Sequence, residues 1–157
     1  MSKNWQLILM ALACSAAVAD TGSGLVLENA WVRALPPTQA NTAAYLEMSN
    51  RGEVELSIVG GRAALAERLE IHTTREIDGY MRREQLNQLR LEPGETLRLE
   101  PGGTHLMLLG LERMPAVGES VRLCLELSAG GEVCTEPPVR KGKSSGTPHH
   151  HHHHQQD

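Results

Sequence analysis

Short apolar or alternating runs, broken by glycine, proline and asparagine, fill the chain from Leu25 to Val139. Alternation with a period of two places successive side chains on opposite faces of a strand, and closely spaced turns are typical of an antiparallel sandwich or barrel. We therefore predict an all-β domain of eight or nine strands. The clearest runs are residues 25–34, 42–49, 54–60, 68–73, 79–83, 105–111 and 119–127, with a last strand near residue 134.

One short motif occurs twice, at residues 89–94 and 97–102, with the sequence Leu-Arg-Leu-Glu-Pro-Gly. Each copy alternates and ends in a Pro-Gly turn, so we interpret the pair as two successive strands. Only residues 63–68 resemble a helix, and one turn there would leave the all-β class unchanged.

The first nineteen residues have the pattern of a secretory signal. Lys3 supplies the positive end, residues 5–14 are apolar, and Ala17-Val18-Ala19 is a small-residue cleavage site. Cys14 could instead accept a lipid, but Ala11-Leu12-Ala13 matches poorly the Leu-led motif of lipoprotein processing. We expect a cleaved signal over residues 1–19 and a periplasmic protein without a membrane anchor.

Composition excludes several kinds of function. The formal net charge of −4 disfavours nucleic-acid binding. Phenylalanine is absent and aromatic residues make up 3% of the chain, so the core must be aliphatic and an aromatic-lined sugar site is not expected. There is no nucleophile-and-base motif and no Cys-x-x-Cys, and the predicted domain, residues 20–139, has only two histidines. We do not expect an enzyme.

Two cysteines remain once the signal is removed. Cys124 and Cys134 flank a turn at residues 128–132 and could face each other across a hairpin. Export permits oxidation, so we predict a structural disulfide. A dithiol that binds copper is the alternative, although the spacing lacks the arrangement that lowers a thiol pKa.

The tail, residues 140–157, has almost no apolar residues to bury, and we expect it to be disordered. It has the composition of an added affinity tag, but tags seldom precede Gln-Gln-Asp, so we treat it as native. Imidazoles on a flexible tether would then scavenge metal ions near the domain. The histidines concerned are His149, His150, His151, His152, His153 and His154.

The strongest chemical signal is a histidine and a methionine two residues apart. The period of two sends His105 and Met107 to the same face of a strand, where they can bind one ion. Imidazole with thioether favours copper, especially Cu(I), over hard cations and over zinc. Alone, the pair could equally fill a sandwich core, because this strand is apolar on both faces.

The middle of the chain resembles the periplasmic copper chaperone family called PCuAC. The matching segments are Ala30–Ala34 with Pro36-Pro37, Ala44–Leu46 leading to Asn50, Glu70–His72, and above all Pro101–Leu111. The resemblance implies a cupredoxin-like Greek-key β-sandwich that binds Cu(I). It also implies delivery of copper to an acceptor protein, plausibly the CuA centre of cytochrome oxidase.

That resemblance further implies a ligand pattern of His, ten residues, Met, twenty-one residues and His-x-Met. His72, His105 and Met107 fall on the pattern, whereas the methionine position holds Arg83. Met81 lies two residues earlier and on the same face of an extended strand, so we take it as the fourth ligand. A three-coordinate site without Met81 is the alternative.

Two hypotheses of different classes follow. The first is a monomeric copper chaperone that passes Cu(I) by ligand exchange. The second is a metal-free interaction module whose copper site has decayed through the loss of methionine at Arg83, with the histidine tail as a separate metal scavenger.

Overall fold

The computed structural model describes residues 22–142, which form eleven strands and no helix. The all-β prediction is confirmed, but eight or nine strands is too few, because the three-residue strands β6 and β11 carry little pattern of their own. Among these residues no helix is long and apolar enough to cross a membrane. The strands are β1 (Leu25–Ala34), β2 (Thr42–Asn50), β3 (Leu56–Ala63), β4 (Ala66–Ile77), β5 (Tyr80–Leu86), β6 (Leu89–Leu91), β7 (Thr96–Leu99), β8 (His105–Leu111), β9 (Leu123–Leu127), β10 (Glu132–Thr135) and β11 (Val139–Lys141).

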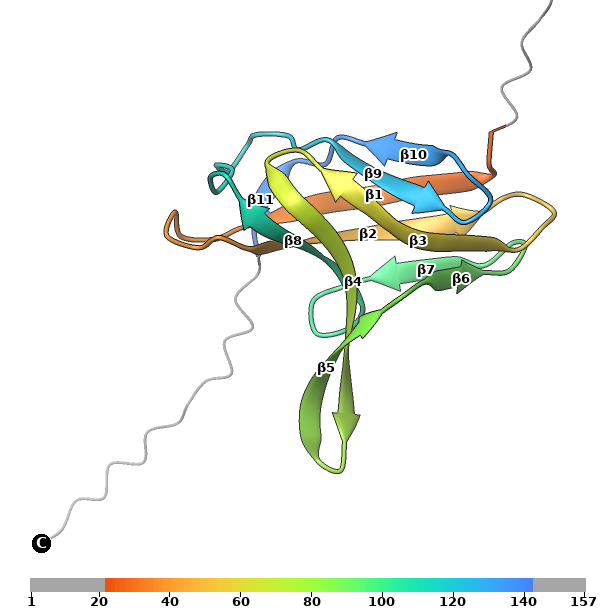
Figure 1. Ribbon diagram of the computed structural model, residues 1–157, viewed down its shortest axis with the longest axis horizontal. Helices are drawn as coiled ribbons and strands as arrows, with labels where there is room; N and C mark the ends of the chain where they lie inside the picture. The colour runs from red at the N-terminus through yellow and green to blue at the C-terminus, as the bar shows by residue number, and fades with distance from the viewer. Residues whose placement is uncertain (1–21, 143–157) are drawn as a thin grey trace, which may run out of the picture.

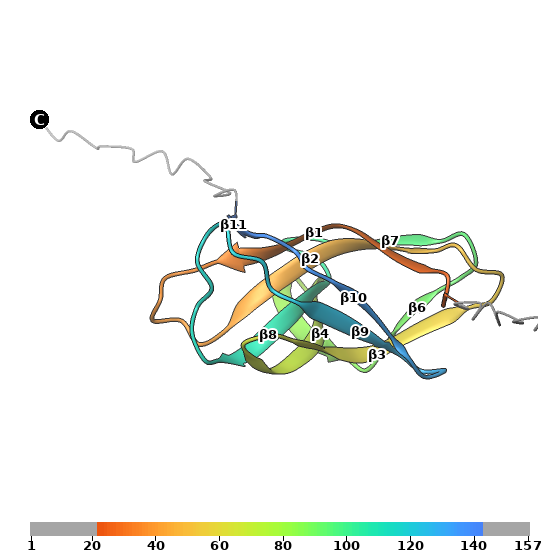
Figure 2. The ribbon, with the colours of Figure 1, turned by 90° about the horizontal axis from the view of Figure 1, so that it is seen from above.

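Two sheets pack against each other (Figures 1 and 2). The larger has the order β11-β1-β2-β8-β4-β5, with β7 also paired to β2, and the smaller has the order β10-β9-β3-β6. Described neighbours run antiparallel except β1 and β11, which are parallel. Since β11 includes Arg140 and Lys141, which we expected in the tail, regular structure continues past Val139.

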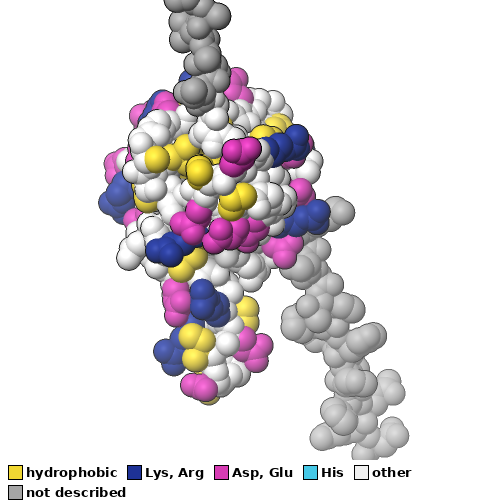
Figure 3. All heavy atoms as spheres, turned by 90° about the vertical axis from the view of Figure 1, so that its right-hand side faces the viewer, with side chains coloured by type: hydrophobic (Ala, Val, Ile, Leu, Met, Phe, Trp, Pro, Cys, Tyr) yellow, Lys and Arg dark blue, Asp and Glu magenta, His cyan; other side chains and the backbone are white. Residues whose placement is uncertain are grey.

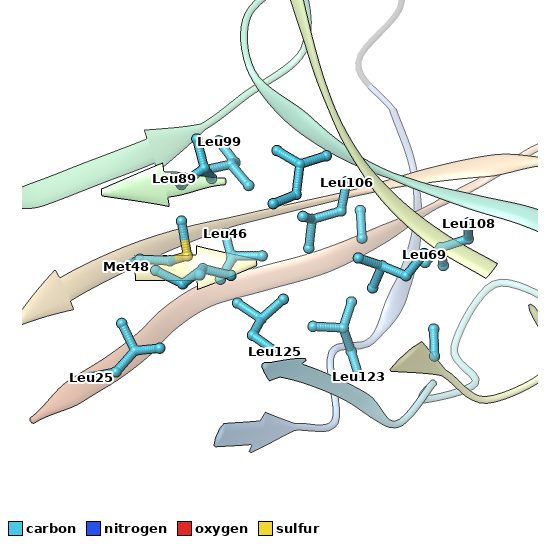
Figure 4. Close-up of a cluster of buried hydrophobic side chains, with 14 of the residues drawn as sticks. Leu25, Leu46, Met48, Leu69, Leu89, Leu99, Leu106, Leu108, Leu123 and Leu125 are labelled. Atoms are coloured by element: carbon cyan, nitrogen blue, oxygen red, sulfur yellow. The ribbon is translucent and has the colours of Figure 1, made fainter. Parts of the chain in front are cut away.

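Aliphatic side chains and one methionine fill the space between the sheets (Figure 4). Leu106 and Leu108 of β8 are fully buried and belong to the same cluster as Leu123 and Leu125 of β9. Met48 is also fully buried and is a core residue. Burying each such side chain contributes about 1.5–3 kcal/mol, so this layer supplies most of the driving force for folding.

The β4–β5 hairpin projects from the body of the sandwich as an arm (Figure 1). Its two-residue turn, Asp78-Gly79, has φ of 53° and 79°, which suits the right-handed twist of a hairpin. β5 is the free edge of the larger sheet and is exposed along all but its last residue. Figure 3 shows charged and hydrophobic side chains on this arm, and the arm includes the exposed Tyr80 and Met81.

Asn50, at the end of β2, joins the two sheets through a buried side chain. Its amide donates to the carbonyl oxygens of Val54 at 2.7 Å and Leu91 at 3.0 Å. Its Oδ1 atom accepts from the backbone of Gly52 at 2.9 Å. The side chain of Asn50 and the residue Leu91 are both 0% exposed, so the Leu91 carbonyl would lack a partner without it.

We predict that Asn50→Ala lowers the free energy of unfolding by about 2–4 kcal/mol, because it leaves the buried Leu91 carbonyl unpaired and removes two further hydrogen bonds. Urea denaturation followed by circular dichroism measures this loss. Asn41→Ala is the matched control, since the exposed Asn41 accepts only one described hydrogen bond, from Gly110. It should cost less than about 1 kcal/mol, and equal losses in the two variants would contradict the role given to Asn50.

Candidate metal centre

Strand β8 divides its side chains between the core and the outer face of the larger sheet. Leu106 and Leu108 point into the core, whereas His105 and Met107 alternate with them and are half-buried. The alternative in which His105 and Met107 fill the core does not describe this structure, because neither belongs to the core cluster. Both side chains are therefore on a face that a metal ion or a partner can approach.

His72 lies directly across from His105 on the neighbouring strand β4. Their ring centroids are 6.2 Å apart. Two imidazoles that bind one ion have centroids within about 6.5 Å, because each metal–nitrogen bond is about 2 Å long. Met107 is paired with Glu70 one step along the same face. The two imidazoles are within the distance that one ion can bridge, and Met107 occupies the neighbouring position on the same face.

Hydrogen bonds hold one nitrogen of each imidazole. Nδ1 of His105 lies 2.9 Å from the carbonyl oxygen of Gly103 and must donate to it, which leaves the lone pair on Nε2. Nε2 of His72 lies 2.8 Å from Oε2 of Glu70; donation there leaves the lone pair on Nδ1. Metal-binding histidines commonly have such a carbonyl or carboxylate partner on the other nitrogen.

A cleft of about 450 Å³ opens beside His105 and Met107. Strands β1, β2, β4, β5 and β8 contribute to its wall, as do the loops near Leu35 and Gly102. The lining includes Met81 and Arg83 from the arm but not His72, which adjoins the cleft only through its neighbour His105. His105, Met107, Met81 and Arg83 thus meet in one concave surface.

The pairing of β4 with β5 shows that Arg83 lies closer to His72 than Met81 does. Gln85 is opposite His72, Arg83 is opposite Thr74, and Met81 is opposite Glu76. Arg83 is therefore the diagonal neighbour of His72, and Met81 lies one step farther out with 63% of its surface exposed. Met81 shares the cleft with His105 and Met107, but the arm must bend toward β8 before its sulfur can join them.

Two aromatic side chains, Tyr45 and Trp31, lie beside His105. The ring of Tyr45 lies 6.3 Å from that of His105 and 4.6 Å from that of Trp31. The guanidinium of Arg33 sits over Tyr45 at 5.3 Å. Burial raises the pKa of the Tyr45 phenol, and Arg33 lowers it by a smaller amount, so the phenol stays neutral at physiological pH.

Sequence reasoning did not assign Arg33, Tyr45 and Glu70 to this site. All three occur in the matching segments, but only as landmarks of the resemblance. The alternation of side chains along each strand could have placed them on the outer face. In the sheet, each of these residues is level with His105 or Met107.

The two cysteines lie on the smaller sheet. Cys124 of β9 and Cys134 of β10 are directly opposite each other and are joined by a disulfide. Neither sulfur is a free thiol in this state, so neither is available to copper. The tail histidines, His149 to His154, lie outside the described residues.

A family model described as "Putative lipoprotein LpqE-like" matches residues 25–139. A curated relative, "Putative lipoprotein Lxx21020" of Leifsonia xyli subsp. xyli (strain CTCB07), is 31% identical over 118 residues. That alignment covers 74% of this chain and 70% of the relative.

Solved structures with the same fold include copper-bound proteins. The solution structure of CuI-DR1885 from Deinococcus radiodurans is 30% identical, with a TM-score of 0.62, covering 83% of this chain and 87% of that one. The copper-bound PCuAC domain from PmoF2 is 21% identical, with a TM-score of 0.63, covering 76% of this chain and 94% of that one. The resemblance to PCuAC expected from the sequence is confirmed.

Proposed function

The chain belongs to the LpqE-like family and has the fold of PCuAC domains, and on this premise we propose that it binds copper and passes it to an acceptor without catalysing a reaction. One observation carries the proposal: His72 and His105 are paired across two strands, and Met107 is on the same outer face. The solution structure of CuI-DR1885, which is 30% identical to this chain, supports the choice of metal.

In this proposal His72 and His105 supply nitrogen and Met107 supplies sulfur. Soft thioether and imidazole ligands favour Cu(I) among the metals available outside the cytoplasm. Met81 is the fourth ligand when the arm bends toward the sheet, and the site is three-coordinate when it does not. His105 is already oriented for this role, because Gly103 holds its Nδ1 and leaves Nε2 free.

Release to an acceptor fits the same geometry. The proposed ligands are half-buried beside an open cleft, so an incoming ligand can reach the ion before the protein's own ligands leave. Ligand exchange of this kind needs no unfolding of the sandwich. We propose a protein acceptor, and delivery to the CuA centre of cytochrome oxidase is the route that the PCuAC resemblance implies.

Arg83 is the observation that favours a second candidate function. It occupies the family's methionine position and lines the cleft, where its positive charge opposes a cation. An arginine at this position is what we expect of a metal-free interaction module whose copper site has decayed. The two candidates differ in one measurable property, which is stoichiometric Cu(I) binding by the folded domain.

The family description also bears on where the protein works. We propose that it acts in the cell envelope, after export directed by the signal-like segment at its N-terminus. The description "lipoprotein" favours Cys14 as a lipid acceptor, against the soluble form that Ala11-Leu12-Ala13 suggests.

We predict that the protein made in a bacterial host with radiolabelled palmitate carries label that is lost in Cys14→Ser. The substitution removes the only thiol to which the lipid can be attached in that segment. Cys124→Ser, in the folded domain, is the control and should keep the label. Unlabelled parent protein that is released by osmotic shock would instead establish the soluble form.

For copper, we predict that the protein with its six tail histidines replaced by asparagine binds one Cu(I) in competition with a chromogenic chelator. His105→Ala and Met107→Leu should each weaken binding by about tenfold or more, equivalent to about 1.4 kcal/mol. Met114→Leu is the control because Met114 lies outside the cleft wall, and it should bind like the parent. Failure of the parent to compete would leave only the metal-free module.

We also predict that Arg83→Met strengthens Cu(I) binding by about tenfold or more, because it removes a positive charge and restores a thioether. Arg82→Met is the matched control, since Arg82 alternates with Arg83 along β5 and pairs with Arg75 on the other face. The same competition titration measures both variants. Equal affinity in Arg83→Met and the parent would mean that position 83 does not contact the ion.

A further inference from the structure

Among the described residues, two arginines line the cleft and no acidic residue does. Arg33 comes from β1 and Arg83 from the arm. Within residues 22–142 neither guanidinium has a carboxylate within 4.0 Å, whereas seven other arginines do, as in the 2.6 Å pair of Arg62 with Glu132. The cleft therefore has an excess of positive charge in its wall.

Arg33 is held in place without satisfying its donors. Its guanidinium lies over the Tyr45 ring at 5.3 Å. Its Nε is buried and has no hydrogen-bond partner among the described residues. The buried Nε lies beside Gly142, so an anion in the cleft would accept from the terminal Nη atoms of this guanidinium. The side chain is preorganised by stacking, so little rotamer entropy would be lost on binding.

The acidic residues near the cleft on this face do not neutralise the positive charge of Arg33 and Arg83. Glu70 lies 2.8 Å from His72 and 3.5 Å from Arg68, so it is already engaged. Glu76 is opposite Met81, near the end of the arm, and it forms no described ion pair with Arg83. A Cu(I) ion held by neutral His105 and Met107 would add a further positive charge to the same wall.

We propose that the cleft is a carboxylate-binding site, in which Arg33 and Arg83 together hold a small carboxylate beside the copper ligands. The planar guanidinium fork matches a carboxylate with two parallel hydrogen bonds, and two forks from different strands would favour a dicarboxylate. A volume of about 450 Å³ accommodates such a molecule. Carboxylate binding itself does not depend on the proposed function, whereas its coupling to copper does.

Charge couples the binding of the carboxylate to the binding of Cu(I). A bound carboxylate offsets the guanidinium charges that oppose Cu(I), so each ligand should raise the affinity for the other by the same factor. This gives a physical reason for an arginine at the family's methionine position. The site then binds copper more tightly when an anion is present.

The first test uses the copper-free protein with its tail histidines replaced. Malonate is added while the side-chain Nε–H signals of the arginines are followed by ¹⁵N NMR. We expect a saturable shift of the Arg33 and Arg83 signals, with binding at least tenfold weaker in Arg83→Gln and in Arg33→Gln. Arg82→Gln faces the opposite side of β5 and should bind malonate like the parent. Because Arg83 is exposed, its substitution keeps the test valid even if Arg33→Gln fails to fold.

A second arm distinguishes the sources of the carboxylate. The peptide acetyl-Gly-Asp-Gly-amide is titrated in parallel with malonate. Binding of malonate alone supports a free small carboxylate, and binding of the peptide alone supports a side chain presented by another protein. No saturable shift with either compound overturns the proposal.

The third arm measures Cu(I) affinity with and without malonate. We expect malonate to raise the affinity severalfold in the parent and not in Arg83→Gln. Copper binding without any carboxylate effect would leave the proposed function intact and refute the coupling. Carboxylate binding in a protein that takes up no Cu(I) would refute the proposed function alone.

Discussion

Burial of Leu106 and Leu108 between the sheets is the constraint on which the rest of this structure depends. Both are fully buried, so β8 cannot shift by one residue without exposing them and placing His105 and Met107 in the core. The antiparallel register then sets His72 opposite His105 and Ala43 opposite Met107. The hydrophobic core and the candidate metal centre are consequences of one alternation, seen from the two faces of a single sheet.

The arm extends this face beyond the sandwich. Its two-residue turn fixes which residue of β5 lies opposite each residue of β4, so the place of Arg83 beside His72 is determined by the turn and not by local packing. An exposed edge strand can tolerate substitutions that the core would not. A change between thioether and guanidinium at position 83 would therefore have little effect on folding, although it would change the charge of the cleft wall.

Local pattern was sufficient to predict the ends of β1 and β8 and the shared face of His105 and Met107. It could not supply Arg33 and Tyr45, because they come from β1 and β2 and reach His105 only through the order of strands in the sheet. β11 was missed for a related reason. Arg140 and Lys141 carry no apolar alternation, and the strand forms by parallel pairing with β1, a contact between the two ends of the described chain.

A copper carrier must hold its ion firmly enough to exclude competitors and loosely enough to release it. Four soft ligands give a high affinity for the ion. Removing one of them makes release easier, but it lowers the affinity at all times. With a guanidinium in place of the thioether, the loss of copper affinity would depend on whether an anion is bound. An anion in the cleft cancels the repulsion between the guanidinium and the ion, and its departure restores that repulsion. On the two proposals made above, the cleft would then hold its copper while the carboxylate is bound, and would favour transfer once an acceptor displaces that carboxylate.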